Sequence, residues 1–398
     1  MNSKLFVFIT PSIVNIGGAQ LYIARKKEYL ESLGWKVIII SCIEGEIIIP
    51  NLKDSMNVVI PMLKMPFNIT NKSRRAKIKR RIVIPAADLI VVEANTIALS
   101  IWSEYIFDES SIKKICYPLS EQFPAFSKDE INYLCFKLKQ KLLYGITPKS
   151  IPMILGENLP YDTCLKAIGC RSNIVDDITN INIRIPKADY TILSLGRLDK
   201  PYIPYAFASV RKFASENKCK RINLILVGDN NYNVYRDFSV EEKNLNVIKT
   251  GALFPIPRTI FQNSNVAIAS AGCVSVCTLE GVPTIVVDAN DYKAIGIFKQ
   301  TTNNSMLREQ YERQIEIVQL LNEVLIENKY KNITEMPDVS LDYSKHLEII
   351  EQPYDNPEIW FDVTRMKISF KKRCIRIFYF IFGFNLLNKI FELKSFLK

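Results

Sequence analysis

The stretch from Ala269 to Asp288 limits the possible folds of this chain more than any other part of it. It reads ASAGCVSVCTLEGVPTIVVD. Apolar residues at both ends flank a small-residue turn, Ser270–Gly272, and a short amphipathic segment that closes at Gly281 and Pro283. This order predicts a strand, a tight turn, a helix and a second strand. Small residues in such a turn allow backbone amides to approach a ligand closely, so we expect a ligand contact here.

The first part of the chain repeats this alternation of apolar runs and helical spacing. The spacing predicts a helix over residues 21–33, and Gly34 is a typical residue to end it. With the paired glycines at 17 and 18 and the apolar run at 36–41, it forms a unit that is typical of doubly wound parallel sheets. The strands predicted in this part are residues 5–9, 36–41, 58–61, 88–93, 114–117 and 152–155.

The second part begins after a polar stretch at residues 172–182 and repeats the same logic. Its predicted strands are residues 190–195, 222–227, 247–250 and 266–269, and its predicted helices cover 206–213 and 306–328. We therefore predict an α/β fold with two doubly wound domains. Their expected bounds are residues 1–185 and 186–345, followed by a C-terminal helical extension over 346–398.

Length and composition agree with two domains. The chain has 398 residues, 48% of them hydrophobic, which allows sizeable cores. Its formal charge of +11 suggests an anionic partner, namely nucleic acid, a membrane surface or a phosphorylated substrate. No helix-turn-helix, RNA-binding or zinc signature accompanies the charge, so nucleic acid is not expected.

The cysteine and histidine content limits the chemistry. The nine cysteines are scattered and include no Cys-x-x-Cys pair, which predicts reduced thiols in a cytosolic protein rather than disulfides or a metal site. His346 is the only histidine, so a mechanism that needs two histidines is excluded. The apolar run at residues 4–9 lacks a small-residue cleavage site, and we expect it to be a buried strand rather than a signal peptide.

Groups suited to a diphosphate follow several predicted strands of the second domain. Arg197 and Lys200 come after one strand, and an arginine fork and a lysine point charge are the groups that a diphosphate needs. The turn at Ser270 would add backbone amides and the partial positive charge of a helix start. The candidate ligand-binding residues are Gly17, Gly18, Gly228, Asp229, Gly251, Ser270, Ala271, Gly272, Cys273, Val274, Ser275 and Glu280.

Two carboxylates of the first domain are candidates for acid–base chemistry. Glu93 and Glu121 fall at or just past the ends of predicted strands, and ligands of open parallel sheets bind outside the carboxyl ends. A helix cap or a surface loop charge is the alternative interpretation of each one. The paired glycines at 17 and 18 have an equally simple alternative, a turn that starts a helix.

The order of these motifs resembles that of the sugar-nucleotide glycosyltransferases of GT-B architecture, in particular the family 4-like group that builds bacterial capsule, exopolysaccharide and lipopolysaccharide. The resemblance covers roughly residues 1 to 300. It rests on the Gly17-Gly18 turn, the run at 36–41, and three motifs of the second domain. These are Ser194, Gly196, Arg197, Leu198 and Lys200; then Val227, Gly228 and Asp229; then Gly281, Pro283 and Ile285.

The sequence departs from that pattern at its paired glutamates. Val276 and the small residues at 269–272 stand where the family carries them, and Glu280 is shifted by about one helical turn. A family histidine after the strand at Asp88 is also absent. Three readings stay open: an inverting enzyme whose base is Glu93 or Glu121, a divergent retaining enzyme, or an inactive relative.

The two basic regions suggest where the protein acts. Residues Lys72–Arg81 are densely basic, and Ile368–Lys398 combines basic residues with phenylalanine, isoleucine and leucine. The apolar part of the C-terminal run is shorter than the roughly 20 residues of a spanning helix. We expect it to lie in the membrane interface. The alternative is the closing helix that GT-B proteins pack on the first domain, and the two can hold together.

The resemblance implies a GT-B fold, with two facing Rossmann-like domains, and hexosyl transfer from a nucleoside diphosphate sugar to a glycan acceptor, lipid-linked in our expectation. The protein would be cytoplasmic, peripheral at the inner face of the cytoplasmic membrane, and would need no cofactor and no metal. Arg197 and Lys200 would offset the charge of the leaving diphosphate. The alternatives are a non-catalytic GT-B subunit that binds a partner transferase or acceptor, and a sugar-nucleotide epimerase.

Overall fold

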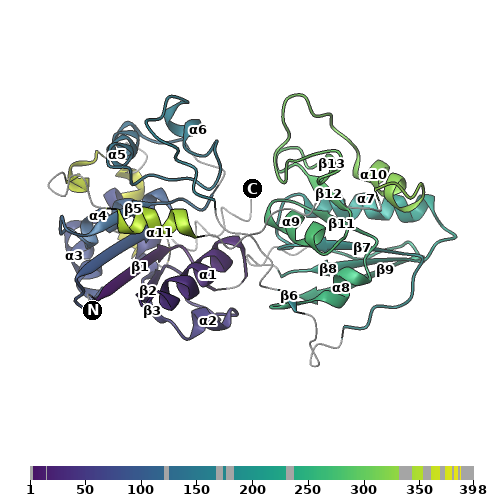
Figure 1. The fold of residues 1–398 in the computed structure, drawn as a ribbon, viewed down its shortest axis with the longest axis horizontal. Helices are drawn as coiled ribbons and strands as arrows, with labels where there is room; N and C mark the ends of the chain where they lie inside the picture. The colour runs from purple at the N-terminus through teal and green to yellow at the C-terminus, as the bar shows by residue number, and fades with distance from the viewer. Residues whose placement is uncertain are drawn as a thin grey trace. The chain divides into compact units, whose positions relative to one another are not determined.

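The structure is a computed structural model of the whole chain. It describes residues 3–14, 16–120, 125–166, 174–175, 183–229, 237–330, 343–352, 360–367, 373–378, 381–383 and 386. The chain divides into two compact units, residues 1–168 with 342–398, and residues 169–341 (Figure 1). The boundary expected at residue 185 therefore lies inside the second unit, and the boundary expected at 345 lies just inside the returning segment.

The first unit is built on a five-stranded sheet in the order β3-β2-β1-β4-β5, and all its strand pairs are parallel. The strands are β1 Lys4–Thr10, β2 Lys36–Ser41, β3 Met56–Val59, β4 Leu89–Ala94 and β5 Lys113–Cys116. The helices are α1 Gly18–Ser32, α2 Pro50–Lys53, α3 Lys72–Arg81, α4 Ile97–Ile106, α5 Lys128–Lys139, α6 Pro152–Leu155 and α11 Ser344–Glu351. Short 3-10 turns cover Pro61–Lys64, Phe67–Ile69 and Val363–Arg365.

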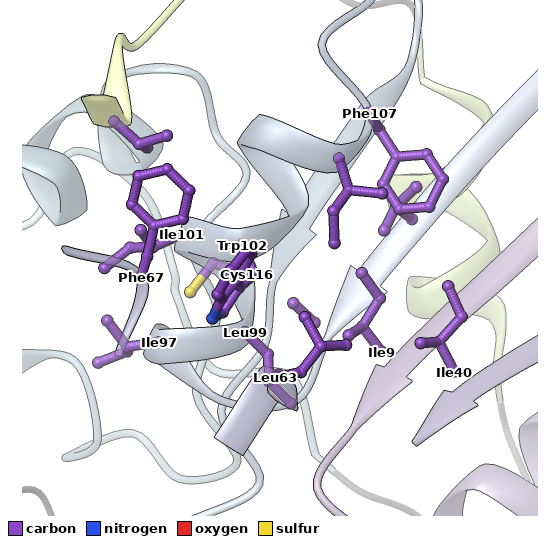
Figure 2. Close-up of a cluster of buried hydrophobic side chains, with 14 of the residues drawn as sticks. Ile9, Ile40, Leu63, Phe67, Ile97, Leu99, Ile101, Trp102, Phe107 and Cys116 are labelled. Atoms are coloured by element: carbon purple, nitrogen blue, oxygen red, sulfur yellow. The ribbon is translucent and has the colours of Figure 1, made fainter. Parts of the chain in front are cut away.

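The strands of this sheet are apolar on both faces because both faces are covered. Leu5, Val7 and Ile9 of β1 pack into a large cluster with Trp102 of α4 (Figure 2). Phe6 and Phe8 point to the other face, where Phe6 meets Trp35 edge-on. This two-sided burial explains why the parallel strands read as unbroken apolar runs rather than as alternating patterns.

The second unit is built on a six-stranded sheet in the order β13-β12-β11-β7-β8-β9. Its strands are β7 Tyr190–Leu195, β8 Ile222–Val227, β9 Leu245–Gly251, β11 Val266–Ala269, β12 Thr284–Val287 and β13 Ala294–Ile297. All pairs are parallel except β12 with β13 at the edge. The helices are α7 Ile203–Glu216, α8 Arg258–Gln262, α9 Gly272–Leu279 and α10 Ile317–Leu325, and a small pair joins β6 Ile174–Val175 to β10 Ile256–Pro257.

Both units are therefore built on Rossmann-like α/β sheets, as expected, and among the described strand pairs only the β12–β13 edge pair is antiparallel. Two local predictions are wrong. Residues 152–155 form the short helix α6 rather than a strand, with Pro152 at a first-turn position where proline is well tolerated. The helical pattern expected over 306–328 is helical only at α10, and the residues before it form a loop that pairs with the β13 edge.

The segment after the second unit returns to the first one. Helix α11 packs its buried residues, among them His346, Ile349 and Ile350, into this unit. The ammonium of Lys113 in β5 donates to the carbonyls of Ile349 and Ile350, at 3.0 and 2.7 Å. Helix α11 thus belongs to the first unit. The closing helix expected within residues 368–398 stays a prediction, because most of those residues lie outside the described ones.

Candidate functional site

The candidate ligand site of the second unit is built on turns that follow neighbouring strands. The Gly196 amide extends the ladder after β7 by donating to Val227 at 2.9 Å, and the Gly228 amide donates to Gly251 at 2.9 Å. The turns are in close contact: a Cβ atom added to Gly228 would lie 2.0 Å from the Gly196 oxygen. Gly228 also has a φ of +147°, so no other residue fits here without displacing the turn after β7.

Lys200 connects the turn after β7 to the turn after β11. Its half-buried ammonium donates to the Ser270 carbonyl at 3.4 Å, which places it beside the start of α9. A helix start carries partial positive charge and outward-directed amides. A lysine at the same point adds a full positive charge, and the two together favour an anion.

Arg197 belongs to the same turn and keeps part of its side chain in solvent. Its side chain is 37% exposed, and its Nε lies 3.4 Å from the Asp199 carboxylate. Asp199 is largely buried, so it restrains the arginine without covering it. The structure thus brings Arg197, Lys200 and the turn at Ser270 to one edge of one sheet.

The start of α9 is held by strained backbone and by a neighbouring loop. Ala271 has a φ of +62°, an unusual value for a residue with a side chain, and its amide donates to Ser305 at 2.7 Å. That amide is therefore engaged by the protein itself. Non-glycine residues in such conformations are often found at ligand sites.

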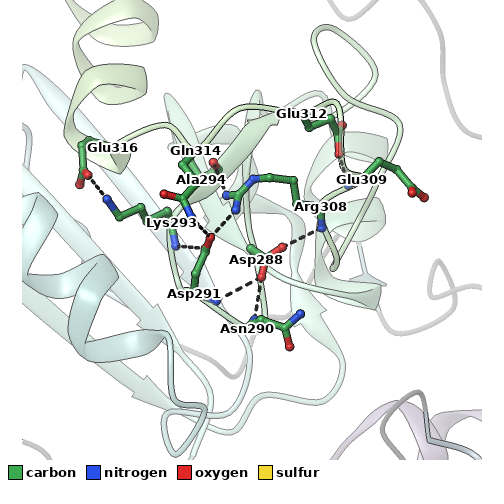
Figure 3. A network of polar contacts seen from close by, with 10 residues as sticks. All are labelled: Asp288, Asn290, Asp291, Lys293, Ala294, Arg308, Glu309, Glu312, Gln314 and Glu316. Carbon is green, nitrogen blue, oxygen red and sulfur yellow. Dashed lines mark hydrogen bonds and ion pairs between the residues drawn. The ribbon is translucent and has the colours of Figure 1, made fainter.

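The loop that carries Ser305 is in turn fixed by a polar network (Figure 3). The Asp288 carboxylate accepts from the amides of Asn290 and Arg308, each at 2.7 Å. The Arg308 guanidinium pairs with Asp291 and donates to the Ala294 carbonyl at 3.0 Å. The pattern of the sequence did not identify Asp288 and Arg308, although an aspartate directly after a buried strand is the available signal.

Several predicted ligand residues have other roles in the structure. Val274 is fully buried in the core, so its side chain serves packing. Glu280 caps the far end of α9 and forms an ion pair with Arg258 at 2.7 Å. It is thus separated from Lys200 by the length of the helix. Cys273 and Ser275 are half-buried in the first turns of α9, and Cys273 is not in a disulfide.

In the first unit, the paired glycines start helix α1. Gly17 is the N-cap residue, and its extended backbone requires no special freedom. Its carbonyl accepts the first helical hydrogen bond, from the amide of Leu21 at 3.0 Å. These glycines therefore form a helix-start turn, and their role at a ligand stays a prediction.

Glu93 is the centre of a buried polar network rather than a solvent-facing carboxylate. It is 0% exposed, forms an ion pair with Lys26, and accepts from the Tyr22 hydroxyl at 3.0 Å and the Asn95 amide at 3.0 Å. Burial lowers the pKa of Lys26, and the Glu93 carboxylate opposes this shift. Because Glu93 is fully buried, its carboxylate oxygens cannot contact a substrate in this conformation. The second candidate base, Glu121, lies outside the described residues.

His346 completes this network from helix α11. Its Nε2 lies 3.1 Å from the Lys166 carbonyl, and because a carbonyl only accepts, this nitrogen carries the proton. Nδ1 then accepts from the Lys26 ammonium at 3.2 Å. Burial, followed by the charge of Lys26, lowers the pKa of His346 to about 2. Sequence reasoning missed Lys26 and Tyr22, although a glutamate inside a buried strand requires a partner.

The network predicts a pH dependence of stability. His346 is neutral in the folded state but titrates near 6.5 when unfolded, so the unfolded state binds the extra proton. The contribution of His346 to the free energy of unfolding is fully present above pH 6.5. Below that pH the free energy of unfolding should fall by about 1.4 kcal/mol per pH unit. Because His346 is the only histidine, the window from about pH 6.5 to about pH 5, above the range where carboxylates titrate, isolates this group.

Urea unfolding at pH 7, 6 and 5 measures this slope, with His346→Gln as the matched variant. The glutamine amide can replace both hydrogen bonds but does not titrate. We expect wild-type protein to lose stability across this window and the variant to lose little. Equal slopes in the two proteins would show that His346 does not control the dependence.

Searches against protein-family models and against curated protein sequences give no match. Solved structures do match in fold. A glycosyltransferase from Rickettsia africae ESF-5 aligns with a TM-score of 0.56 at 16% identity, covering 88% of this chain and 98% of that one. A putative UDP-N-acetylglucosamine 2-epimerase from Listeria monocytogenes gives 0.53 at 13% identity, over 91% and 99%. The S. aureus MnaA–UDP co-structure gives 0.50 at 14% identity, over 88% and 99%.

These likenesses show the fold and not the activity, because all three identities are low. The chain has two Rossmann-like sheets, as the GT-B architecture requires. The alignments support this fold because they cover almost the whole of each neighbour. The chain therefore has the α/β GT-B fold, which both a glycosyltransferase and an epimerase of sugar nucleotides adopt.

Proposed function

We propose that this protein transfers a sugar from a nucleoside diphosphate sugar to a glycan acceptor. The observation that carries the proposal is the meeting of Lys200, Arg197 and the start of α9 at one sheet edge. A diphosphate leaving group gains negative charge in the transition state, and fixed positive groups at that point stabilise it.

In this proposal Arg197 and Lys200 hold the diphosphate and stabilise it as it leaves, without a metal. The acceptor hydroxyl attacks the anomeric carbon, the bond from that carbon to the diphosphate oxygen breaks, and the hydroxyl proton passes to a base. Glu93 serves as that base only if its network opens, since it is buried and paired with Lys26. Glu121 remains the other candidate of the sequence.

The test is incubation of the purified protein with nucleoside diphosphate sugars, with and without glycan acceptors, followed by mass spectrometry of the products. Release of nucleoside diphosphate that depends on the acceptor is expected. Conversion of the sugar nucleotide to an isomer, without an acceptor, would instead identify an epimerase. The Listeria neighbour, which is named a putative UDP-N-acetylglucosamine 2-epimerase, supports this alternative.

A non-catalytic GT-B subunit is the other alternative, and one observation favours it. Both candidate glutamates that the structure describes form ion pairs within the protein, Glu93 with Lys26 and Glu280 with Arg258. Such a subunit would turn over no donor under any of these conditions.

We also propose that the acceptor is lipid-linked and that the first unit binds the inner face of the cytoplasmic membrane, as part of surface polysaccharide synthesis. Within the described residues no helix is both long and apolar enough to cross a bilayer. The C-terminal residues 373–378 are helical, and Ile375 and Phe378 pack against Met65 and Ile69. This contact joins residues 373–378 to the rest of the first unit.

The described residues of this segment also include apolar side chains that face solvent. Large side chains are exposed at Ile377, Ile381, Phe382 and Leu386, by 61, 64, 52 and 43%. The basic helix α3 lies nearby, because Arg376 is close enough to Arg75 to help lower its pKa, after the larger effect of burial. In α3 only Ile78 is buried, so most of its lysine and arginine side chains reach solvent. Apolar side chains beside cations suit an anionic lipid surface.

Replacing Ile377 and Ile381 by serine should reduce this binding. Each isoleucine contributes roughly 1.5–3 kcal/mol when fully buried, so we expect at least a tenfold lower partition into anionic vesicles. Vesicle flotation with phosphatidylglycerol-containing and pure phosphatidylcholine vesicles measures it. Met153→Ser is the matched control, since Met153 is a 66% exposed apolar residue elsewhere in the same unit. Unchanged flotation of the double variant would contradict the proposal.

A further inference from the structure

Tyr202 has a buried hydroxyl group that makes no hydrogen bond within the described structure. The residue lies directly before α7 and is only 3% exposed. Buried hydroxyls almost always have a partner, because losing water without one costs free energy. An exception beside a candidate ligand site therefore points to a ligand.

The hydroxyl faces the same point as the groups of the candidate site. Around the position that a Cβ of Gly196 would take, Lys200 Nζ lies at 3.5 Å, Cys273 Sγ at 3.5 Å and Tyr202 Oη at 3.6 Å. Gly196 carries no side chain to fill this space. An ammonium, a thiol and a phenol thus surround one small volume next to the start of α9.

The chemistry of these groups matches an anion with several oxygens. Burial raises the pKa of Tyr202 well above its ordinary value, and Cys273 and Cys277 raise it further, so the phenol keeps its proton. A phosphate oxygen has lone pairs and no proton to offer, so it needs donors. Lys200 supplies charge and Tyr202 supplies a directed donor. A neutral hydroxyl also fixes the direction of one hydrogen bond to the anion without adding another positive charge.

We propose that Tyr202 is a ligand-binding residue of this site, whose hydroxyl donates a hydrogen bond to a non-bridging oxygen of the bound diphosphate. The inference rests on the proposed function and adds to it a contact that the sequence did not suggest. The phenol binds and orients the diphosphate; it transfers no proton.

The test compares wild-type protein with Tyr202→Phe by calorimetric titration of inorganic pyrophosphate and UDP. Losing a hydrogen bond to a charged oxygen should weaken binding about tenfold or more. The unliganded variant should melt at the same temperature as wild type or higher, because it loses a buried hydroxyl without a partner. A merely structural hydroxyl would not produce this combination. Tyr205→Phe is the matched control, since Tyr205 is 54% exposed on the first turn of α7.

Alkylation of the full-length protein gives a second readout. Bound pyrophosphate or UDP should slow the reaction of Cys273 with N-ethylmaleimide, and Tyr202→Phe should need about tenfold more ligand for the same protection. The exposed Cys219 and Cys374 are internal controls that should react at unchanged rates.

The outcomes separate this inference from the function on which it rests. If both ligands bind wild type and Tyr202→Phe equally, the role of Tyr202 is refuted and the donor site stands. If pyrophosphate protects Cys273 but UDP does no better, the subsite stands and a nucleotide donor is refuted. If neither ligand binds wild type, both proposals are overturned.

Discussion

Replacing Lys26 by methionine should lower the free energy of unfolding of the first unit by about 3–5 kcal/mol. Lys26 and Glu93 are both essentially buried and form an ion pair, and His346 and Tyr22 lie against them. Removing the ammonium leaves the Glu93 charge in an apolar interior with only neutral donors. The cost comes from that uncompensated charge rather than from the lost attraction alone.

Urea unfolding followed by tryptophan fluorescence measures this effect selectively. All three tryptophans, Trp35, Trp102 and Trp360, belong to the first unit, so the signal reports on that unit alone. Lys79→Met is the matched control, because Lys79 of the same unit pairs with Asp108 and the two side chains are 35 and 54% exposed. Such a pair contributes roughly 0–1 kcal/mol. Equal losses in the two variants would show that the buried network is not what stabilises this unit.

Replacing Arg197 or Lys200 by alanine should reduce sugar transfer by about 10²- to 10³-fold each while the protein stays folded. Both side chains are at least partly exposed at the sheet edge, so little core packing is lost. Each removes a fixed positive group from the place where the leaving diphosphate would gain charge. Turnover of the donor found in the product assay measures the loss.

Lys212→Ala is the matched control for these variants. Lys212 is a 62% exposed lysine on α7 of the same unit, 3.9 Å from Glu216. Its removal changes the net charge by the same amount but leaves the candidate site intact, so its turnover should be normal. Near-normal turnover of Arg197→Ala and Lys200→Ala would refute the site.

Much of the sheet architecture could be predicted because its strands are short, apolar and separated by clear turn residues. The predicted bounds of the strands at 36–41, 190–195, 222–227 and 266–269 coincide with the structure. The antiparallel edge strand β13 was not predicted, since its four residues, AIGI, carry no strand-specific signal. The run at 152–155 is too short for periodicity to distinguish a strand from a helical turn.

The candidate site was predictable only in part, for a physical reason. Turn residues that follow strands can be recognised from the local sequence, so Lys200 and the turn at Ser270 could be proposed as site residues from the sequence alone. Partners that are far apart in the chain cannot be recognised in this way. Glu93 lies in one network with Lys26 and His346 only after folding, and the same holds for the pair of Glu280 and Arg258. A carboxylate at a strand end can be a base or half of a buried pair. The sequence alone does not distinguish the two.

The central claim is that the second unit binds a nucleoside diphosphate at Lys200 and the start of α9. A thermal-shift screen of nucleoside diphosphates and their sugars tests it most directly, with wild type beside Lys200→Ala. We predict that at least one nucleotide raises the melting temperature of wild-type protein and that Lys200→Ala loses most of this shift. Absence of any shift in wild type, or an equal shift in the variant, would contradict the account.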